Sequence, residues 1–145
     1  MELWEHFVEA VAAQFRFLET EFGFARKQTK RPNVIYESDK LQVQVYFDAD
    51  GRRELDLRLR RLADDPRKTL SLGIGMLMRL HGHTEGYSSP FPSTQENLEA
   101  EVKRLAELLR KCGSAVLSGD LRDFDRAERL ERELATKLRM SKQSS

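Results

Sequence analysis

Two histidines in one short segment are the side chains of this sequence best suited to metal or proton chemistry. His81 and His83 flank Gly82, and Glu85 follows them. Imidazole is the commonest transition-metal ligand and titrates near neutral pH, so a small metal-dependent hydrolase could use this segment. No second cluster of ligand-type residues accompanies it in the sequence. We therefore interpret both histidines as ordinary loop residues, expect no catalytic residue, metal or cofactor, and keep the hydrolase as an alternative.

An acidic motif in the first half of the chain resembles a phosphatase signature. The segment Asp48-Ala49-Asp50-Gly51 follows an apolar strand pattern, as the first motif of haloacid-dehalogenase phosphatases does. That fold requires a buried parallel strand, which appears in a sequence as a continuous apolar run. Here Gln42 and Gln44 alternate with apolar residues. Asp50-Gly51 is instead typical of a hairpin turn, so we reject the phosphatase interpretation.

Neither the cysteine nor the paired glycines form a catalytic motif. Cys112 lies on the apolar stripe of a predicted helix, where a cysteine behaves as a small buried hydrophobe. A lone cysteine cannot form an internal disulfide, which fits a reducing compartment. Gly73 and Gly75 lack the third glycine of a dinucleotide-binding fingerprint. We interpret these glycines as permitting close helix packing.

A basic run is the feature that could contact nucleic acid. The segment Arg26–Arg31 carries cations at most of its positions, and we expect it to include a short edge strand. The whole chain, however, has 25 basic and 24 acidic residues and a net charge of +1, whereas nucleic-acid binders usually show a strong basic excess. We favour a solvated edge that discourages strand pairing between molecules, and keep nucleic-acid binding as an alternative.

The first predicted element is an amphipathic helix over residues 2–22. Its apolar residues recur at alternating spacings of four and three, which keeps them on one stripe of a helix. Gly23 follows the last of them, where a left-handed glycine often ends a helix. The stripe consists of Trp4, Val8, Val11, Phe15, Leu18 and Phe22, with Phe7 at its edge.

The middle of the chain predicts an antiparallel meander of three or four strands. Residues 34–36 form one short apolar run, and residues 41–47 and 55–59 show the period of two that marks a half-buried strand. The residues predicted to face the helices are Leu41, Val43, Val45, Phe47, Leu55, Leu57 and Leu59.

The rest of the chain predicts three helices. Residues 70–80 indicate a short buried helix, and Ser93 with Glu96 has the spacing of a capping box ahead of a second amphipathic helix that runs to Val116. Gly119-Asp120 indicates a helix stop followed by the N-cap of a last helix. We expect residues 140–145 to fray.

These elements indicate one α+β domain spanning residues 1–145, with two layers: the antiparallel meander, and the N-terminal and C-terminal helices packed on it. The N-terminus is acidic where a secretion signal needs positive charge, so we expect a cytoplasmic protein. No apolar run approaches the ~20 residues of a membrane-spanning helix.

Two surfaces suit a protein partner. Strict alternation places Gln44, Tyr46, Arg58 and Arg60 on the polar face of the meander, and tyrosine and arginine are enriched at interface hot spots. Phe17 lies about 140° from the stripe of the first helix, so its apolar surroundings need cover. The last helix could supply that cover, or a second copy of the chain in a homodimer.

Several segments together resemble small bacterial immunity-type proteins. They are Phe22-Gly23-Phe24 after the opening helix, Tyr36-Glu37-Ser38 before a valine-rich strand, the arginine-rich Glu-Leu strand that follows it, and the segment from Leu117 through Gly119-Asp120 to Phe124. The resemblance spans most of the chain and transfers no functional residue. It implies a protein that binds and neutralises a partner toxin without catalysis.

Overall fold

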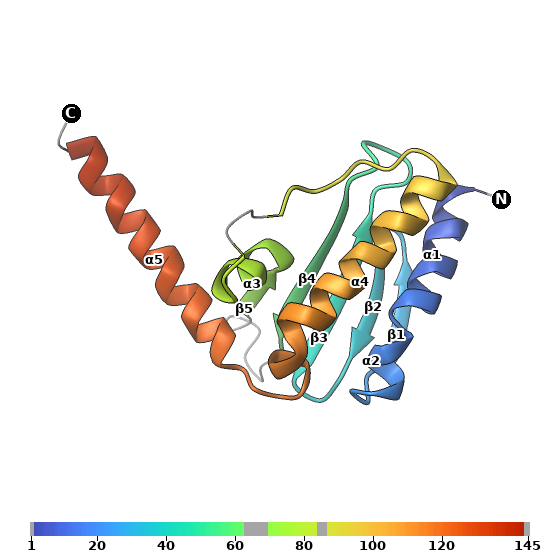
Figure 1. The fold of residues 1–145 in the computed structure, drawn as a ribbon, viewed down its shortest axis with the longest axis horizontal. Helices are drawn as coiled ribbons and strands as arrows, with labels where there is room; N and C mark the ends of the chain where they lie inside the picture. Colours follow the sequence, from blue (N-terminus) through green and yellow to red (C-terminus); the bar gives the residue numbers. More distant parts are fainter. Residues whose placement is uncertain (1, 63–69, 84–86, 144–145) are drawn as a thin grey trace.

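The computed structural model describes residues 2–62, 70–83 and 87–143 of the chain. The helices in this part are α1 (Leu3–Gln14), α2 (Arg16–Thr20), α3 (Ile74–Leu80), α4 (Gln95–Leu117) and α5 (Arg122–Gln143). The strands are β1 (Ala25–Lys30), β2 (Asn33–Glu37), β3 (Leu41–Phe47), β4 (Leu55–Arg61) and β5 (Leu70–Gly73). This arrangement confirms the predicted α+β fold, with an N-terminal helix, an antiparallel sheet and C-terminal helices (Figure 1).

The described strands form one sheet in which each strand pairs antiparallel with the next along the chain, in the order β1-β2-β3-β4-β5. Val45 of β3 lies opposite Val34 of β2 and Leu57 of β4, which places apolar residues of three strands in one row. The predicted register is therefore confirmed, because the seven residues expected to face the helices are all buried.

The segment 70–80 is not one helix as predicted. Leu72 pairs with Leu59 and adds β5 to the sheet beside β4. Gly73 keeps extended backbone and serves as the N-cap of α3, so the chain changes from strand to helix at this glycine. Gly75 lies close to Tyr87, where a Cβ atom would come within 3.4 Å of that side chain.

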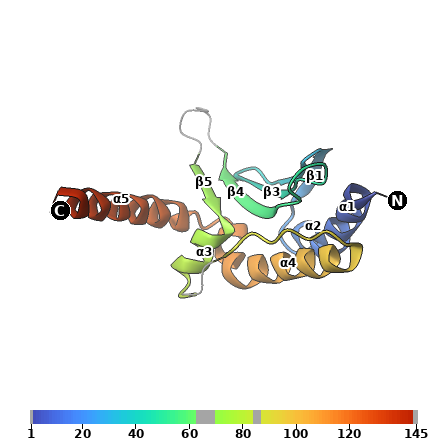
Figure 2. The same ribbon diagram turned by 90° about the horizontal axis from the view of Figure 1, so that it is seen from above.

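Helices α1 and α4 cover one face of the sheet, and the described helices leave the opposite face open (Figure 2). The stripe of α4 is buried as predicted, with Cys112 in it. The predicted capping box is wrong by one residue, since Thr94 is the N-cap and its Oγ1 accepts a hydrogen bond from the Asn97 N–H at 3.2 Å. Gly119, with a φ of 103°, follows the helix as predicted.

The opening helix is interrupted at Phe15, which separates α1 from α2. Phe17 is consequently buried, with its ring 6.1 Å from that of Phe15 and under the guanidinium of Arg110, 5.1 Å away. Arg110 belongs to α4. Helix α4 of the same chain therefore covers Phe17, and the cover does not come from the last helix, α5, or from a second copy of the chain. The expectation that Phe17 offers a surface to a partner is wrong.

Helix α5 starts on the body of the protein and then projects away from it (Figure 1). Phe124 and Ala127 are buried against the rest of the chain, whereas residues 131–142 are exposed. Residues 140–143 continue the helix instead of fraying, and residues 144–145 lie outside the described part. Among the described helices, none combines the length and the apolarity needed to cross a membrane.

Candidate functional site

The open face of the sheet carries the polar residues that the alternation predicted. Gln44 of β3 pairs with Arg58 of β4, and Tyr46 pairs with Asp56. Arg58 is exposed and the other three are half-buried. Tyr46 and Arg58 therefore lie diagonally across two strands on one face, close enough for a single partner to contact both.

Side-chain hydrogen bonds along β3 and across to its neighbouring strands fix part of this face. Gln42 Nε2 donates to Glu37 Oε1 at 2.8 Å, and Gln44 Nε2 donates to Gln42 Oε1 at 2.6 Å. Arg60 Nη1 donates to the same Gln42 oxygen at 3.5 Å. Arg60 is thus already engaged within the sheet. In the described part of the chain, the Arg58 guanidinium has no such hydrogen bond and remains available to a partner.

A depression of about 200 Å³ lies beside these residues. It is lined by Gln44, Tyr46, Glu54, Asp56, Leu57 and Arg58. Burial raises the pKa of Asp56, although the Leu57 N–H, which donates to its Oδ1 at 2.8 Å, lowers it. Burial also raises the pKa of Tyr46, and Asp48 and Glu54 add to the shift. The depression therefore offers acceptors and a donor in a partly desolvated setting.

A second hollow of about 400 Å³ continues this surface toward α5. Arg58 lines both hollows and connects the sheet face to the groove between β5 and α5. The groove is lined by Arg58, Leu70, Ser71, Gly73, Phe124, Ala127, Glu128 and Glu131. Sequence reasoning missed this groove because it placed no strand at residues 70–73.

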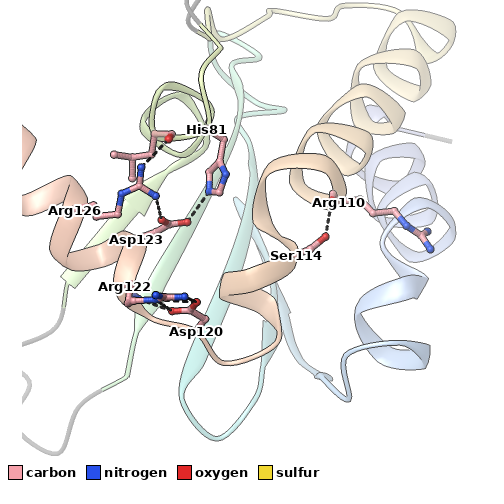
Figure 3. Close-up of polar contacts among 8 residues, drawn as sticks. His81, Arg110, Ser114, Asp120, Arg122, Asp123 and Arg126 are labelled. Carbon is pink, nitrogen blue, oxygen red and sulfur yellow. Dashed lines mark hydrogen bonds and ion pairs between the residues drawn. The ribbon is translucent and has the colours of Figure 1, made fainter.

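A charged cluster joins α3 to the start of α5 (Figure 3). His81 Nε2 lies 2.7 Å from Asp123 Oδ2, and Arg126 Nη1 donates to Asp123 Oδ1 at 2.9 Å. Arg126 Nη2 also donates to the Leu80 carbonyl at 3.0 Å. Asp123 is buried, and its carboxylate contacts both His81 and Arg126. These two contacts anchor the first turn of α5. Sequence reasoning missed Asp123, whose one signal was an acid in the first turn of a predicted helix.

The hollow at this cluster, about 280 Å³, does not supply a complete hydrolase site. Its described lining includes His81 and Asp123 but not His83. The nearby Ser114 Oγ donates to the Arg110 carbonyl of its own helix at 2.7 Å (Figure 3). Within residues 2–62, 70–83 and 87–143, no three His, Cys, Asp or Glu side chains gather as metal ligands. Glu85 lies outside the described residues.

Most of the basic run, from Arg26 to Lys30, lies on β1 at the edge of the sheet, as predicted, and Arg31 follows the strand. Arg31, the last residue of the run, is engaged by two acids, Glu2 at 2.8 Å and Asp50 at 2.9 Å. The Arg31 guanidinium also lies 5.5 Å from the centre of the Trp4 ring. The run therefore does not act as one block of uncommitted cations.

Replacing Asp123 with alanine is expected to lower the free energy of unfolding by about 1–3 kcal/mol, because His81 and Arg126 lose a buried hydrogen-bond partner. Amide exchange in the first turns of α5 should accelerate. Asp125→Ala is the matched control, since Asp125 is an exposed acid in the same first turn. Urea denaturation with hydrogen exchange measures both effects. Equal losses of unfolding free energy in the two variants would contradict the assigned role of Asp123, because they would show that any acid in the first turn of α5 contributes the same stability.

The pair formed by Asp120 and Arg122 gives a pH prediction. The Arg122 guanidinium, helped by its backbone N–H, lowers the pKa of the Asp120 carboxyl from 3.8 to about 2. Because the folded-state pKa is depressed, the pair's stabilisation is present above pH 3.8 and is lost as pH falls toward 2. In Arg122→Ala, carbon-13 NMR should show the pKa of Asp120 rising from about 2 toward 3.8, and the backbone N–H of residue 122, which the variant keeps, should hold it below that ordinary value. Arg126→Ala should leave the Asp120 titration unchanged, and identical midpoints in wild type and Arg122→Ala would contradict the assignment.

No family model, no curated protein and no solved structure matches this chain. The acids and bases at the junction of α3 and α5 are already paired with one another. On the open sheet face, the Arg58 guanidinium lies beside Tyr46 and near the Asp56 charge, and it makes no hydrogen bond or ion pair with the described residues.

Proposed function

We propose that this chain is a non-catalytic protein-binding module whose partner docks on the open face of β3 and β4. The observation that carries the proposal is the placement of Tyr46 and Arg58 together at one partly desolvated depression. Tyrosine offers a large amphipathic contact with few rotors to order, and arginine offers a planar donor fork for carboxylates. Such residues at the centre of a patch are typical interface anchors.

The charge pattern of the face describes the partner that would fit. Arg58 projects a cation, while Glu54 and Asp56 line the same depression as acids. A partner that presents a carboxylate to Arg58 and a cation to Asp56 would satisfy both. The raised pKa of Asp56 supports this pattern, because a partner cation would compensate a carboxylate that the protein leaves poorly solvated.

The finer form of the proposal is that the partner is a toxin and that binding neutralises it in the bacterial cytoplasm. Support for this form comes from the resemblance of Phe22-Gly23-Phe24, Tyr36-Glu37-Ser38 and the segment around Gly119-Asp120 to immunity-type proteins. An inhibitor of this kind needs a complementary surface and no catalytic group, which is the kind of surface that the open face offers.

The hydrolase alternative has weaker support. His81 does meet a carboxylate in a surface hollow, but Asp123 also accepts a hydrogen bond from Arg126. The described lining of that hollow contains no hydroxyl or thiol that His81 could activate. We therefore assign the cluster to anchoring α5.

A quantitative pull-down from a lysate of the source organism tests the proposal. Wild type, Tyr46→Ala/Arg58→Ala and Arg52→Ala/Phe91→Ala serve as baits. The control pair also removes one arginine and one aromatic, since the Arg52 guanidinium lies 5.7 Å from the centre of the exposed Phe91 ring in the described structure. The proposal expects a partner captured by wild type and by the control but not by the sheet-face variant. Equal capture by all three folded baits would refute it.

A further inference from the structure

The projecting part of α5 has an apolar stripe that the described part of the chain does not cover. Leu130 is half-buried, Leu134 is 36% exposed and Leu138 is 64% exposed. At 100° per residue these three leucines, with Ala127 before them, lie within an arc of about 80° on the helix. The exposed part of α5 covers residues 131–142. An isolated helix as short as this part is marginal in water, because most helical stability in proteins comes from packing an apolar face.

The charges of α5 are distributed unevenly along its length. Residues 128–133 hold the acids Glu128, Glu131 and Glu133 beside the bases Arg129 and Arg132, whereas residues 134–143 carry Lys137, Arg139 and Lys142 and contain no acid. The outer half is therefore basic, and the acids of the helix lie in the inner half. Two such helices repel at their outer halves when parallel, but place basic ends beside acids when antiparallel.

We propose that α5 pairs antiparallel with α5 of a second copy of this chain, through the stripe of Leu130, Leu134 and Leu138. With Leu134 at the crossing point, Leu130 lies level with the second copy's Leu138. Lys137 and Glu133 lie on the same flank of the stripe, so Lys137 comes within two residues of being level with the second copy's Glu133. The same contacts occur twice because the arrangement is two-fold symmetric. The leucine stripe lies on α5 and Tyr46 on β3, so the pairing does not depend on the proposed function, although Arg58 lines both the depression beside Tyr46 and the groove at the base of α5.

The groove at the base of α5 provides a place for the second copy's basic end. Glu128 and Glu131 line this groove of about 400 Å³, together with apolar surface from Leu70 and Ala127. The stripe begins at Ala127, so a helix lying along it in the antiparallel direction enters the groove with its C-terminal end. Because α5 projects away from the sheet, the two bodies lie at opposite ends of the helix pair (Figure 1).

Sedimentation equilibrium of the full chain tests the pairing directly. A dissociation constant in the micromolar range gives a populated dimer at protein concentrations up to ~100 µM. At these concentrations the molar mass measured for the wild type should approach twice the chain mass of 16.8 kDa. Leu134→Glu/Leu138→Glu should weaken the dimer at least about a hundredfold, because it places charges in the apolar seam. Arg129→Gln/Thr136→Glu makes the same change in net charge on the opposite side of α5 and should remain dimeric, as should Tyr46→Ala.

Charge reversal tests the direction of pairing. Glu133→Lys and Lys137→Glu should each dimerise about tenfold more weakly than wild type, because each places like charges on the same flank of the seam. An equimolar mixture of the two variants should recover dimer. Circular dichroism confirms that each variant keeps its helices. The proposal would be overturned by a monomeric wild type, by a leucine variant that still dimerises like wild type, or by a mixture that does not recover dimer. If the wild type is monomeric and its stripe binds a different protein, the stripe would be assigned to that partner.

Discussion

The variant Tyr46→Ala/Arg58→Ala is expected to bind the partner at least about thirtyfold more weakly than wild type, which corresponds to about 2 kcal/mol or more. Both side chains lie on the open face, and removing an interfacial anchor costs the contact and leaves the partner's groups unpaired. Because the two positions are diagonal neighbours, the losses of binding free energy in the two single variants should not sum to the loss in the double variant. Titration calorimetry with the purified partner measures all three.

The same double variant should remain folded. Tyr46 and Arg58 point away from the core, and cross-strand pairs on a sheet face contribute about 0.2–1 kcal/mol each. Its urea midpoint should therefore stay close to that of wild type. Arg52→Ala/Phe91→Ala should retain wild-type affinity. An unchanged dissociation constant in a folded double variant would remove the open face from the binding site.

Phe47→Ala is expected to have the largest effect on stability, a loss of about 3–5 kcal/mol in the free energy of unfolding. Phe47 is fully buried, and its ring centre lies 5.2 Å from that of Phe7, which in turn lies 5.3 Å from Trp4. The substitution removes the aromatic contact between β3 and α1 and leaves a cavity. Since small domains are stable by only about 5–15 kcal/mol, a measurable unfolded population should appear at moderate temperature.

Urea denaturation compares Phe47→Ala with Phe91→Ala. Phe91 is 52% exposed, so its removal should change the free energy of unfolding by less than about 0.5 kcal/mol. Similar losses in the two variants would contradict the assignment of Phe47 to the centre of the core.

The sheet could be predicted from the sequence because its alternation is unambiguous. One face of β3 is apolar at every second residue and the other carries glutamines and a tyrosine, so only one register buries Val43 and Val45. The break at Phe15 could not be predicted, because Phe15 and Leu18 stay on the stripe across it. The sequence misplaces Phe17 for the same reason, since the predicted direction of its side chain assumes a continuous helix.

The strand β5 was missed because a short apolar run has no distinctive period. Leu70 to Leu80 fits a buried helix as well as a strand, and pairing of Leu72 with Leu59 decided the outcome. That pairing joins segments distant in the sequence. The groove beside α5 depends on it, so the groove could not be predicted either.

The candidate site was predicted in part. Alternation placed Gln44, Tyr46, Arg58 and Arg60 on one face, and the structure places them there. Sequence alone could not show that Arg60 is engaged by Gln42 while Arg58 is not, since that depends on the reach of individual side chains. It also gave no sign that His81 would meet Asp123, which is brought to it only by the packing of α5 on α3.

Hydroxyl-radical footprinting of the purified complex is the most direct test of the proposal that the open sheet face binds a protein partner. It compares oxidation of Tyr46 with oxidation of Phe91, an exposed ring that does not line the depression and serves as the internal reference. The predicted result is a several-fold fall in Tyr46 oxidation when the partner is bound, with Phe91 unchanged. Equal oxidation of Tyr46 in the free and bound protein, or protection of Phe91 alone, would contradict the proposal.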